Sequence, residues 1–144
     1  MKLESIFQYL DSLLLVDGYP DYPQALNGVQ VDGPGEVEHV AVAVDASEAT
    51  INEAVNIGAD LLIVHHGLFW KGLQPVTGRY FRKVRKLVKG EVALYSCHLP
   101  LDSHPEVGNC ILLAKSLGLE IEGRFGDHQG VNVGWWGRKD GGAE

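Results

Sequence analysis

Two segments rich in apolar residues, 61–64 and 91–96, flank a helical pattern over residues 77–89, and this order constrains the fold more than any other feature. A strand, a helix and a strand in succession form a right-handed crossover unit with two parallel strands in one sheet. The first segment leads directly into a pair of histidines, and the second leads into a third histidine. Open α/β sheets bind ligands at the carboxyl ends of their strands, so we expect these side chains to converge there.

Other periodicities predict the remaining elements of an α/β fold. Apolar residues spaced three and four apart indicate amphipathic helices, and apolar runs indicate strands. Pro105 and Gly118 suit the start and the end of a helix. The further predicted elements are helices over residues 3–15, 47–57 and 105–117, strands over residues 39–44 and 130–136, and a turn or hairpin at Asn27-Gly28 within residues 26–31. We therefore expect an α/β fold with a largely parallel sheet, crossover helices and a metal site at the carboxyl ends of the strands.

Four side chains of metal-ligating types lie near the predicted strand ends: His65, His66, His98 and Asp102. Imidazole nitrogen and carboxylate oxygen suit zinc, iron and manganese alike, so the ligand set does not name the metal. Neighbouring side chains on an ideal strand point to opposite faces, so the histidine pair can share one ion only if the chain leaves strand geometry at Gly67. The alternative is two ions bridged by Asp102, with a shared water that becomes a nucleophile at neutral pH.

The composition indicates a compact domain. With 144 residues, 45% of them hydrophobic and 22% charged, the chain can bury roughly two-thirds of its unfolded surface. No apolar stretch approaches the roughly 20 residues that span a bilayer, and the first residues are amphipathic and unlike a signal peptide. We therefore expect a single α/β domain over residues 1–144, located in the cytoplasm and not associated with a membrane.

The two cysteines, Cys97 and Cys110, are too few for a disulfide framework and lack the spacing of a metal motif. We expect both to be reduced thiols. Cys97, beside His98, is a conceivable nucleophile, but its sequence surroundings give no sign of activation. Packing as a small apolar residue is therefore favoured.

Six of the 12 basic residues fall on the helical pattern over residues 77–89, which contains no acidic residue. They are Arg79, Arg82, Lys83, Arg85, Lys86 and Lys89. The other six basic residues stand against 19 acidic ones, so this helix could attract a phosphate-bearing ligand or an acidic partner. The alternative is the ordinary solvated side of a helix whose other face is apolar. A net charge of −7 argues against general nucleic-acid binding.

Four stretches of the chain together resemble one protein family. They are residues 26–31 (LNGVQV), Val44-Asp45, residues 62–70 (LIVHHGLFW), and His98-Leu99-Pro100-Leu101-Asp102 continuing to Val107-Gly108-Asn109. In order and spacing they are similar to the GTP cyclohydrolase 1 type 2 family, two-metal proteins also called Nif-three-like proteins. The resemblance implies that His65, His66 and Asp102 bind divalent metal, with up to two ions per site, and that the protein works as a homo-oligomer. It gives no firm role to His98, which we place beside the metals as a candidate for proton transfer.

Members of this family usually continue beyond the length of this chain and add a late histidine and a glutamate, one helical turn apart, to the same metals. The resemblance therefore implies an amino-terminal half, with the usual carboxyl-terminal half absent. His104 and His128 are conceivable substitutes for the missing ligands. Neither ends an apolar strand, so we expect surface or capping roles for both.

The sequence supports three hypotheses of different classes. The first is a metal-dependent hydrolase, GTP cyclohydrolase-like by resemblance, that acts on a nucleotide-like or phosphate-bearing small molecule; His65, His66 and Asp102 are its ligands, and His98 assists. The second is a non-catalytic metal-carrying or interaction module that works as an oligomer. The third is a purely structural role for the histidines, which two strands ending in ligand-type residues disfavour.

Overall fold

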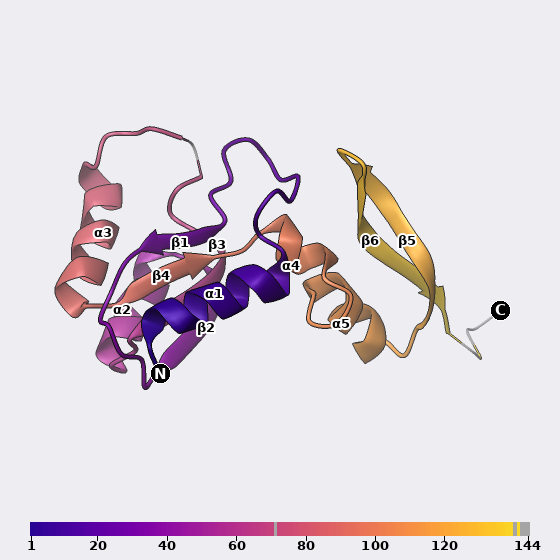
Figure 1. Cartoon of the computed structure of the whole chain (residues 1–144), viewed down its shortest axis with the longest axis horizontal. Coiled ribbons are helices and arrows are strands. Elements are labelled where there is room, and N and C mark those ends of the chain that lie inside the picture. Colours follow the sequence, from indigo (N-terminus) through magenta and orange to yellow (C-terminus); the bar gives the residue numbers. More distant parts are fainter. Residues whose placement is uncertain (71, 140, 142–144) are drawn as a thin grey trace. The chain divides into compact units, whose positions relative to one another are not determined.

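The computed structural model describes residues 1–70, 72–139 and 141, and the chain divides into two compact units. The first unit comprises Met1–Asp17 and Tyr22–His98, and the second comprises Gly18–Asp21 and Leu99–Glu144 (Figure 1). The expectation of a single domain over residues 1–144 stays a prediction, because the structure describes each of the two units separately.

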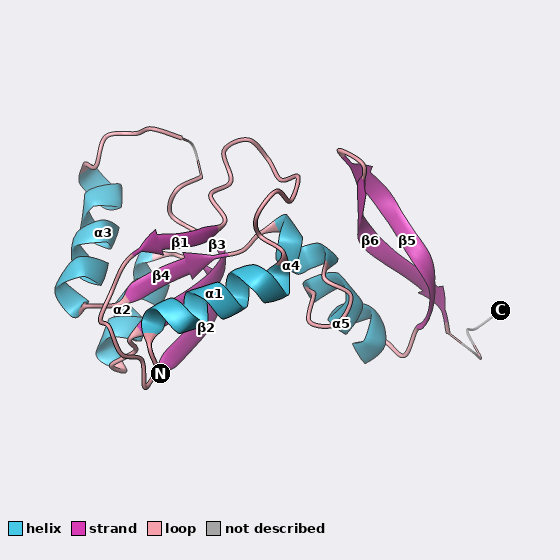
Figure 2. Cartoon of the chain, in the orientation of Figure 1, coloured by secondary structure: helices cyan, strands magenta, loops and turns pink. Residues whose placement is uncertain are grey.

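The first unit is built on a four-stranded sheet in the order β1-β4-β3-β2 (Figure 2). Its strands are β1 (Gly28–Val31), β2 (Val40–Asp45), β3 (Leu61–His66) and β4 (Ala93–Ser96). Its helices are α1 (Leu3–Leu14), α2 (Glu48–Asn56) and α3 (Gly78–Gly90). β3 pairs in parallel with β2 and β4, whereas β1 pairs antiparallel with β4. Since α2 connects β2 to β3 and α3 connects β3 to β4, the predicted α/β fold with a mostly parallel sheet and crossover helices is confirmed.

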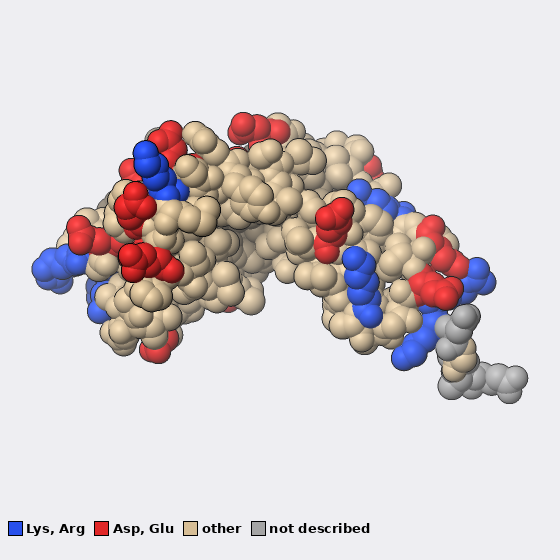
Figure 3. All heavy atoms as spheres, turned by 60° about the horizontal axis from the view of Figure 1, so that its bottom comes forward, with Lys and Arg blue, Asp and Glu red and all other residues tan. Residues whose placement is uncertain are grey.

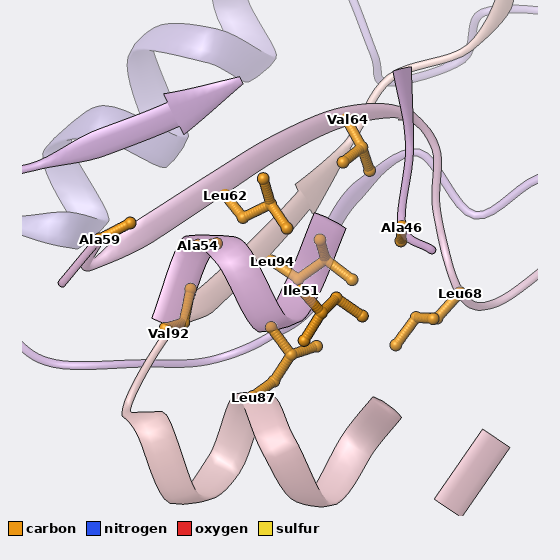
Figure 4. Close-up of a cluster of buried hydrophobic side chains, with 10 residues drawn as sticks. All are labelled: Ala46, Ile51, Ala54, Ala59, Leu62, Val64, Leu68, Leu87, Val92 and Leu94. Carbon is orange, nitrogen blue, oxygen red and sulfur yellow. The ribbon is translucent and has the colours of Figure 1, made fainter. Parts of the chain in front are cut away.

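Helices cover both faces of this sheet. Leu94 of β4 packs with Ile51 of α2 and Leu87 of α3 in one cluster of buried apolar side chains (Figure 4). Tyr95, the next residue of β4, stacks on Phe7 of α1 with ring centroids 6.0 Å apart. Because neighbouring side chains on a strand point to opposite faces, α1 covers one face and α2 with α3 covers the other.

The edge strand β2 has one buried and one exposed face. Val40, Val42 and Val44 are 51%, 76% and 63% exposed, whereas the alternating Ala41 and Ala43 pack against the buried cluster. The alanines let α2 approach the sheet closely, and the valines form an apolar stripe on the surface. Such stripes are typical of protein contact sites.

The first helix after β2 begins where the sequence predicts. The hydroxyl of Ser47 accepts a hydrogen bond from the backbone N–H of Thr50 at 3.0 Å, which caps α2.

Among the helices of residues 1–70, 72–139 and 141, none has the length and apolar character that crossing a bilayer requires. Acidic and basic side chains are mixed on the face drawn in Figure 3, with wide areas between them that carry neither.

The predicted turn or hairpin at Asn27-Gly28 was wrong. Gly28 has a φ of 91° and begins β1, which pairs with β4 instead of with a neighbouring segment. The left-handed conformation that glycine allows serves here as the entry into a strand. A local turn signal was therefore overridden by pairing with a strand distant in the sequence.

The second unit contains two short helices and a hairpin. They are α4 (Leu99–Ser103), α5 (Asn109–Ser116), β5 (Glu120–His128) and β6 (Val131–Arg138). The helix predicted from Pro105 was wrong at its start, since α5 begins at Asn109. A Cβ on the preceding Gly108 would collide with the carbonyl oxygens of Leu101 and His104, so only glycine fits the tight turn between the two helices. The strand predicted over residues 130–136 is β6, and its partner β5 was not predicted.

Candidate metal centre

Three histidines meet at the carboxyl ends of β3 and β4. His65 and His66 are the last two residues of β3, and His98 follows β4 by two residues. One ring nitrogen from each lies within 4.8 Å of those of the other two. We call these three residues the histidine cluster. Their convergence agrees with the expectation from the crossover unit.

The register of the sheet explains this convergence. Val64 of β3 stands opposite Ser96, the last residue of β4. His65 and His66, which end β3, therefore lie at the level of Cys97 and His98, which follow β4. The N–H of Cys97 donates to the carbonyl oxygen of Val64 at 3.0 Å and continues the ladder to the residue before His98. The backbone N–H of His98 then donates to the side-chain oxygen of Asn27 at 2.7 Å, which holds this residue at the sheet edge.

The adjacent histidines approach each other although both belong to β3. Their ring centroids lie 4.5 Å apart, and each ring also lies near His98, at 4.8 Å for His65 and 5.6 Å for His66. β3 ends at His66, immediately before Gly67. The two rings can therefore face one site at the end of the strand, where the alternation of a regular strand no longer separates them.

Hydrogen bonds at Nδ1 fix the tautomers of both strand histidines. Nδ1 of His65 lies 3.0 Å from the carbonyl oxygen of Cys97, and Nδ1 of His66 lies 2.6 Å from a carboxylate oxygen of Asp45. A carbonyl and a carboxylate oxygen accept only, so Nδ1 of each neutral ring carries the proton and Nε2 carries the lone pair. Metal-ligating histidines typically have this arrangement, which orients the ring and raises the basicity of the ligating nitrogen.

The loop after the pair is held by Gln30 of β1. Its side-chain oxygen accepts the N–H groups of Leu68 at 2.6 Å and Phe69 at 3.3 Å, and its nitrogen donates to the carbonyl oxygen of Leu26 at 2.8 Å. A Cβ on Gly67 would collide with the Gln30 amide. Gly67 therefore leaves the space in which the amide of a side chain from a distant strand makes these hydrogen bonds.

An aromatic wall adjoins the histidine cluster. The Trp70 ring meets the ring of His98 edge-on, with centroids 4.6 Å apart, and lies 6.0 Å from that of His66. The Tyr22 ring lies 5.8 Å from that of His98 and 6.4 Å from that of Trp70. His98 is consequently buried, with 8% of its surface exposed. On the side that Trp70 and Tyr22 cover, the cluster is therefore shielded from water.

The carboxylate predicted as a ligand, Asp102, lies on α4 in the second unit. One of its oxygens accepts a hydrogen bond from the side-chain nitrogen of Asn109 at 3.0 Å. Burial, followed by the charge of Asp102, raises the pKa of the Cys110 thiol above its ordinary value, so that thiol stays protonated at neutral pH. The participation of Asp102 in the same site as the histidines stays a prediction.

The two conceivable substitute ligands have local roles. Nδ1 of His104 accepts the N–H groups of Glu106 at 3.1 Å and Val107 at 3.2 Å, which is a capping role in the turn before α5. His128 is hydrogen-bonded to the side chain of Gln129 at 3.1 Å, at the end of β5.

Sequence reasoning missed the roles of Asp45 and Gln30. Asp45 ends β2 and stands opposite His66 in the parallel register, so the rule that brought the histidines together also points to it. The role of Gln30 has no such local signal, because it depends on the pairing of β1 with β4.

The donor chemistry of the cluster fits a divalent transition metal. Three imidazoles lie together, and two of them present oriented Nε2 lone pairs. Imidazole suits zinc, iron and manganese, so the set does not distinguish among them.

Comparison with known proteins agrees with the resemblance seen in the sequence. The chain is 53% identical over 133 residues to a GTP cyclohydrolase 1 type 2 homolog of Halobacterium salinarum, covering 91% of this chain and 51% of the relative. It is 44% identical over 140 residues to the homolog of Pyrococcus horikoshii, covering 97% of this chain and 55% of the relative. The chain thus spans about half the length of the curated relatives it matches.

Solved structures share this fold. The crystal structure of TTHA1606 from Thermus thermophilus matches with a TM-score of 0.81 and 42% identity, covering 92% of this chain and 53% of the other. Reduced HcgD from Methanocaldococcus jannaschii matches with a TM-score of 0.73 and 26% identity, covering 85% of this chain and 49% of the other. The sequence profile of the Duf34/NIF3 (NGG1p interacting factor 3) family matches residues 1–141. The chain therefore belongs to the Duf34/NIF3 family.

Proposed function

We propose that this chain binds one or two divalent ions of zinc, iron or manganese through His65, His66 and Asp102, and supports the metal-dependent hydrolysis of a nucleotide-like or phosphate-bearing small molecule. The observation that carries the proposal is the histidine cluster, whose ligand-type nitrogens lie within 4.8 Å of one another at a sheet edge. Relatives that carry the name GTP cyclohydrolase 1 type 2 homolog support a nucleotide as the substrate class.

Each residue has a distinct part in this proposal. His65 and His66 offer Nε2 lone pairs, because their Nδ1 protons are held by Cys97 and Asp45. Asp102 supplies a carboxylate that can bridge two ions. A metal held there would supply a Lewis acid that polarises the substrate and lowers the pKa of a water molecule. His98, buried against Trp70, is placed to move a proton at the reacting group or to serve as a further ligand.

The test is metal uptake by chelator-stripped protein, measured by elemental analysis and by competition with a chromogenic chelator. The wild type is expected to bind zinc, iron or manganese, and His66→Ala and Asp102→Ala are expected to lose most of the affinity. His39→Ala is the matched control, because His39 is exposed and lies outside the histidine cluster. A wild type that takes up no metal would contradict the proposal at its first step.

Turnover is tested separately with GTP and simple phosphoesters in the presence of each metal. Product formation that disappears in His66→Ala and persists in His39→Ala would support hydrolysis. Intact substrates with a fully loaded protein would leave the metal site standing and remove the hydrolase assignment for this chain.

A second candidate function is a non-catalytic metal-carrying or interaction module that works in the cytoplasm as a homo-oligomer. The observation that favours it is the apolar stripe of Val40, Val42 and Val44 on the edge strand β2. This candidate predicts metal uptake without turnover and a discrete oligomer in light scattering. A monomer at all concentrations would count against it.

A further inference from the structure

A pocket of about 380 Å³ lies in the first unit between the loop after β3 and the start of α3. We call it the Trp70 pocket. Its walls include Gly67, Trp70, Gln74, Arg79, Tyr80 and Lys83. Its volume falls within the range of small-molecule sites, about 300–1,000 Å³. The residues that line it come from the segment that directly follows the histidine pair.

Two cationic side chains line this pocket from one face of α3. Arg79 and Lys83 are four residues apart, so they are neighbours on the helix surface. Lys83 Nζ donates to the carbonyl oxygen of Ala46 at 2.7 Å, which holds the ammonium in place and leaves it two further protons to donate. Within the described part of the chain, Arg79 forms no ion pair with a carboxylate.

Glu48 of α2, whose carboxylate interacts electrostatically with this pair, is already ion-paired with another cation of α3. Glu48 is bound by Arg82, with Nε 2.7 Å from its carboxylate oxygen. The Arg82 hydrogen bond, reinforced by the charges of Arg82, Arg79 and Lys83, lowers the pKa of Glu48 below its ordinary value. The start of α3 therefore has a positive potential that suits an anion.

Neutral donors complete the Trp70 pocket. Burial raises the pKa of Tyr80, so its hydroxyl stays protonated at neutral pH and can donate a hydrogen bond. The side-chain amide of Gln74 offers two further protons. Fixed cations together with neutral donors are the usual means by which proteins bind phosphate.

Trp70 connects this pocket to the histidine cluster. Its ring forms part of the pocket wall and also lies 4.6 Å from the ring of His98 and 6.0 Å from that of His66, measured between centroids. A ligand held by Arg79 and Lys83 would therefore need only to pass one indole ring to reach the three imidazoles. Nucleobases and other planar groups stack well on such a ring.

We infer that the Trp70 pocket anchors the phosphate of a phosphorylated organic substrate, such as a nucleotide, and that the organic part passes Trp70 to reach the histidine cluster. The phosphate is then a handle for binding, and the bond that reacts lies in the organic part. This inference rests on the proposed function for the chemistry at the histidines, whereas phosphate binding by the pocket does not require the metal.

The test measures the binding of guanosine monophosphate, guanosine and inorganic pyrophosphate to metal-free protein by titration calorimetry. The wild type is expected to bind the monophosphate and pyrophosphate, and guanosine at least about tenfold more weakly. Arg79→Ala is expected to weaken the binding of both anions about tenfold. Trp70→Leu is expected to weaken the binding of the monophosphate and to spare that of pyrophosphate.

The matched control is Arg85→Ala, which removes the same charge from the same helix but does not line the Trp70 pocket. Equal losses in Arg79→Ala and Arg85→Ala would show nonspecific attraction by α3 and would overturn the inference, as would equal binding of guanosine and its monophosphate. Metal uptake is measured on the same variants. Loss of anion binding with normal metal uptake separates this site from the proposed metal centre, and a wild type that binds anion but no metal would reject only the proposed function.

Discussion

The carboxylate of Asp45 lies 2.6 Å from Nδ1 of His66 and stands opposite it in the parallel register of β2 and β3. An aspartate at the end of one strand thus orients an imidazole at the end of the next. The pair is partly exposed, with 63% of the Asp45 side chain and 47% of the His66 side chain accessible. The pair therefore contributes little to the free energy of unfolding, and its main effect is to hold one tautomer of His66.

Replacement of Asp45 is expected to weaken metal binding without unfolding the protein. Asp45→Ala removes the acceptor that holds the Nδ1 proton of His66, and loss of such a partner typically costs about 10- to 100-fold in metal affinity. Asp45→Asn keeps an acceptor oxygen without the charge, so its affinity should fall between those of the wild type and Asp45→Ala. Competition with a chromogenic chelator measures the affinities, and circular dichroism checks the fold.

Asp32→Asn serves as the control for these variants, because Asp32 is exposed and its side chain accepts a hydrogen bond from the N–H of Gly33. An Asp45→Ala protein with the metal affinity of the wild type would show that the tautomer of His66 does not depend on this carboxylate.

Gly67→Ala is expected to destabilise the first unit. The added methyl group would collide with the amide of Gln30 and disturb the hydrogen bonds that hold Leu68 and Phe69. Overpacking of this kind typically costs about 1–3 kcal/mol. Urea unfolding followed by circular dichroism measures the loss.

Gly35→Ala is the matched control, since a Cβ at Gly35 would meet no atom within 4 Å. The two variants have the same chemical change and differ only in the space available. Equal stability of both proteins would mean that the loop after β3 can move away from Gln30 at little cost.

Asp60 is expected to make the stability of the first unit depend on pH. Its carboxylate accepts the N–H groups of Glu38 at 2.8 Å and His39 at 2.9 Å, and these bonds, that of His39 first, lower its pKa below the ordinary 3.8. A lowered folded-state pKa contributes stability above the unfolded value, and that contribution is lost as pH falls through the folded-state pKa.

Asp60→Asn should therefore be less stable than the wild type by about 1 kcal/mol at neutral pH, a figure reduced for solvent screening. The difference should shrink as pH falls below 3.8. Chemical unfolding of both proteins at several pH values tests this, and a difference that does not change with pH would contradict the ionic origin of the effect.

Tyr95→Phe is expected to destabilise the face of the sheet that α1 covers. The Tyr95 side chain is fully buried, and its hydroxyl donates to a carboxylate oxygen of Asp11 at 2.8 Å. Removing a hydrogen bond to a charged group costs about 1.5–3 kcal/mol. Tyr9→Phe removes the same hydroxyl from a residue of α1 that is 63% exposed, and it should change stability by less than about 0.5 kcal/mol. Thermal unfolding of the two variants gives the comparison directly.

The sequence was sufficient to predict the parallel strands of the sheet and the meeting of the histidines, because both depend on local patterns. The apolar run before His65 is long enough for a buried strand. In the sequence of α3, apolar residues recur at the spacing of a helix. Two parallel strands with a helix between them must end at the same edge. The position of His98 beside His65 and His66 follows from that rule alone.

The pairing of distant segments could not be predicted in the same way. The Asn27-Gly28 signal for a turn is local, whereas the choice of β4 as the partner of β1 depends on which sheet edge remains open. The role of Gln30 follows from that pairing and was hidden for the same reason. Asp45 could have been recognised, since it ends a strand beside the histidine pair.

The two strand histidines differ in whether a single substitution can remove the hydrogen-bond acceptor at Nδ1. Nδ1 of His65 is hydrogen-bonded to the main-chain oxygen of Cys97, which no amino-acid substitution removes. Nδ1 of His66 is hydrogen-bonded to a side chain, that of Asp45, which one substitution replaces. A single substitution near the cluster can therefore change the tautomer and the orientation of the His66 ring. The orientation of His65 is kept as long as the sheet is intact. In the proposed metal centre, His66 is therefore the histidine through which natural variants could differ in metal preference.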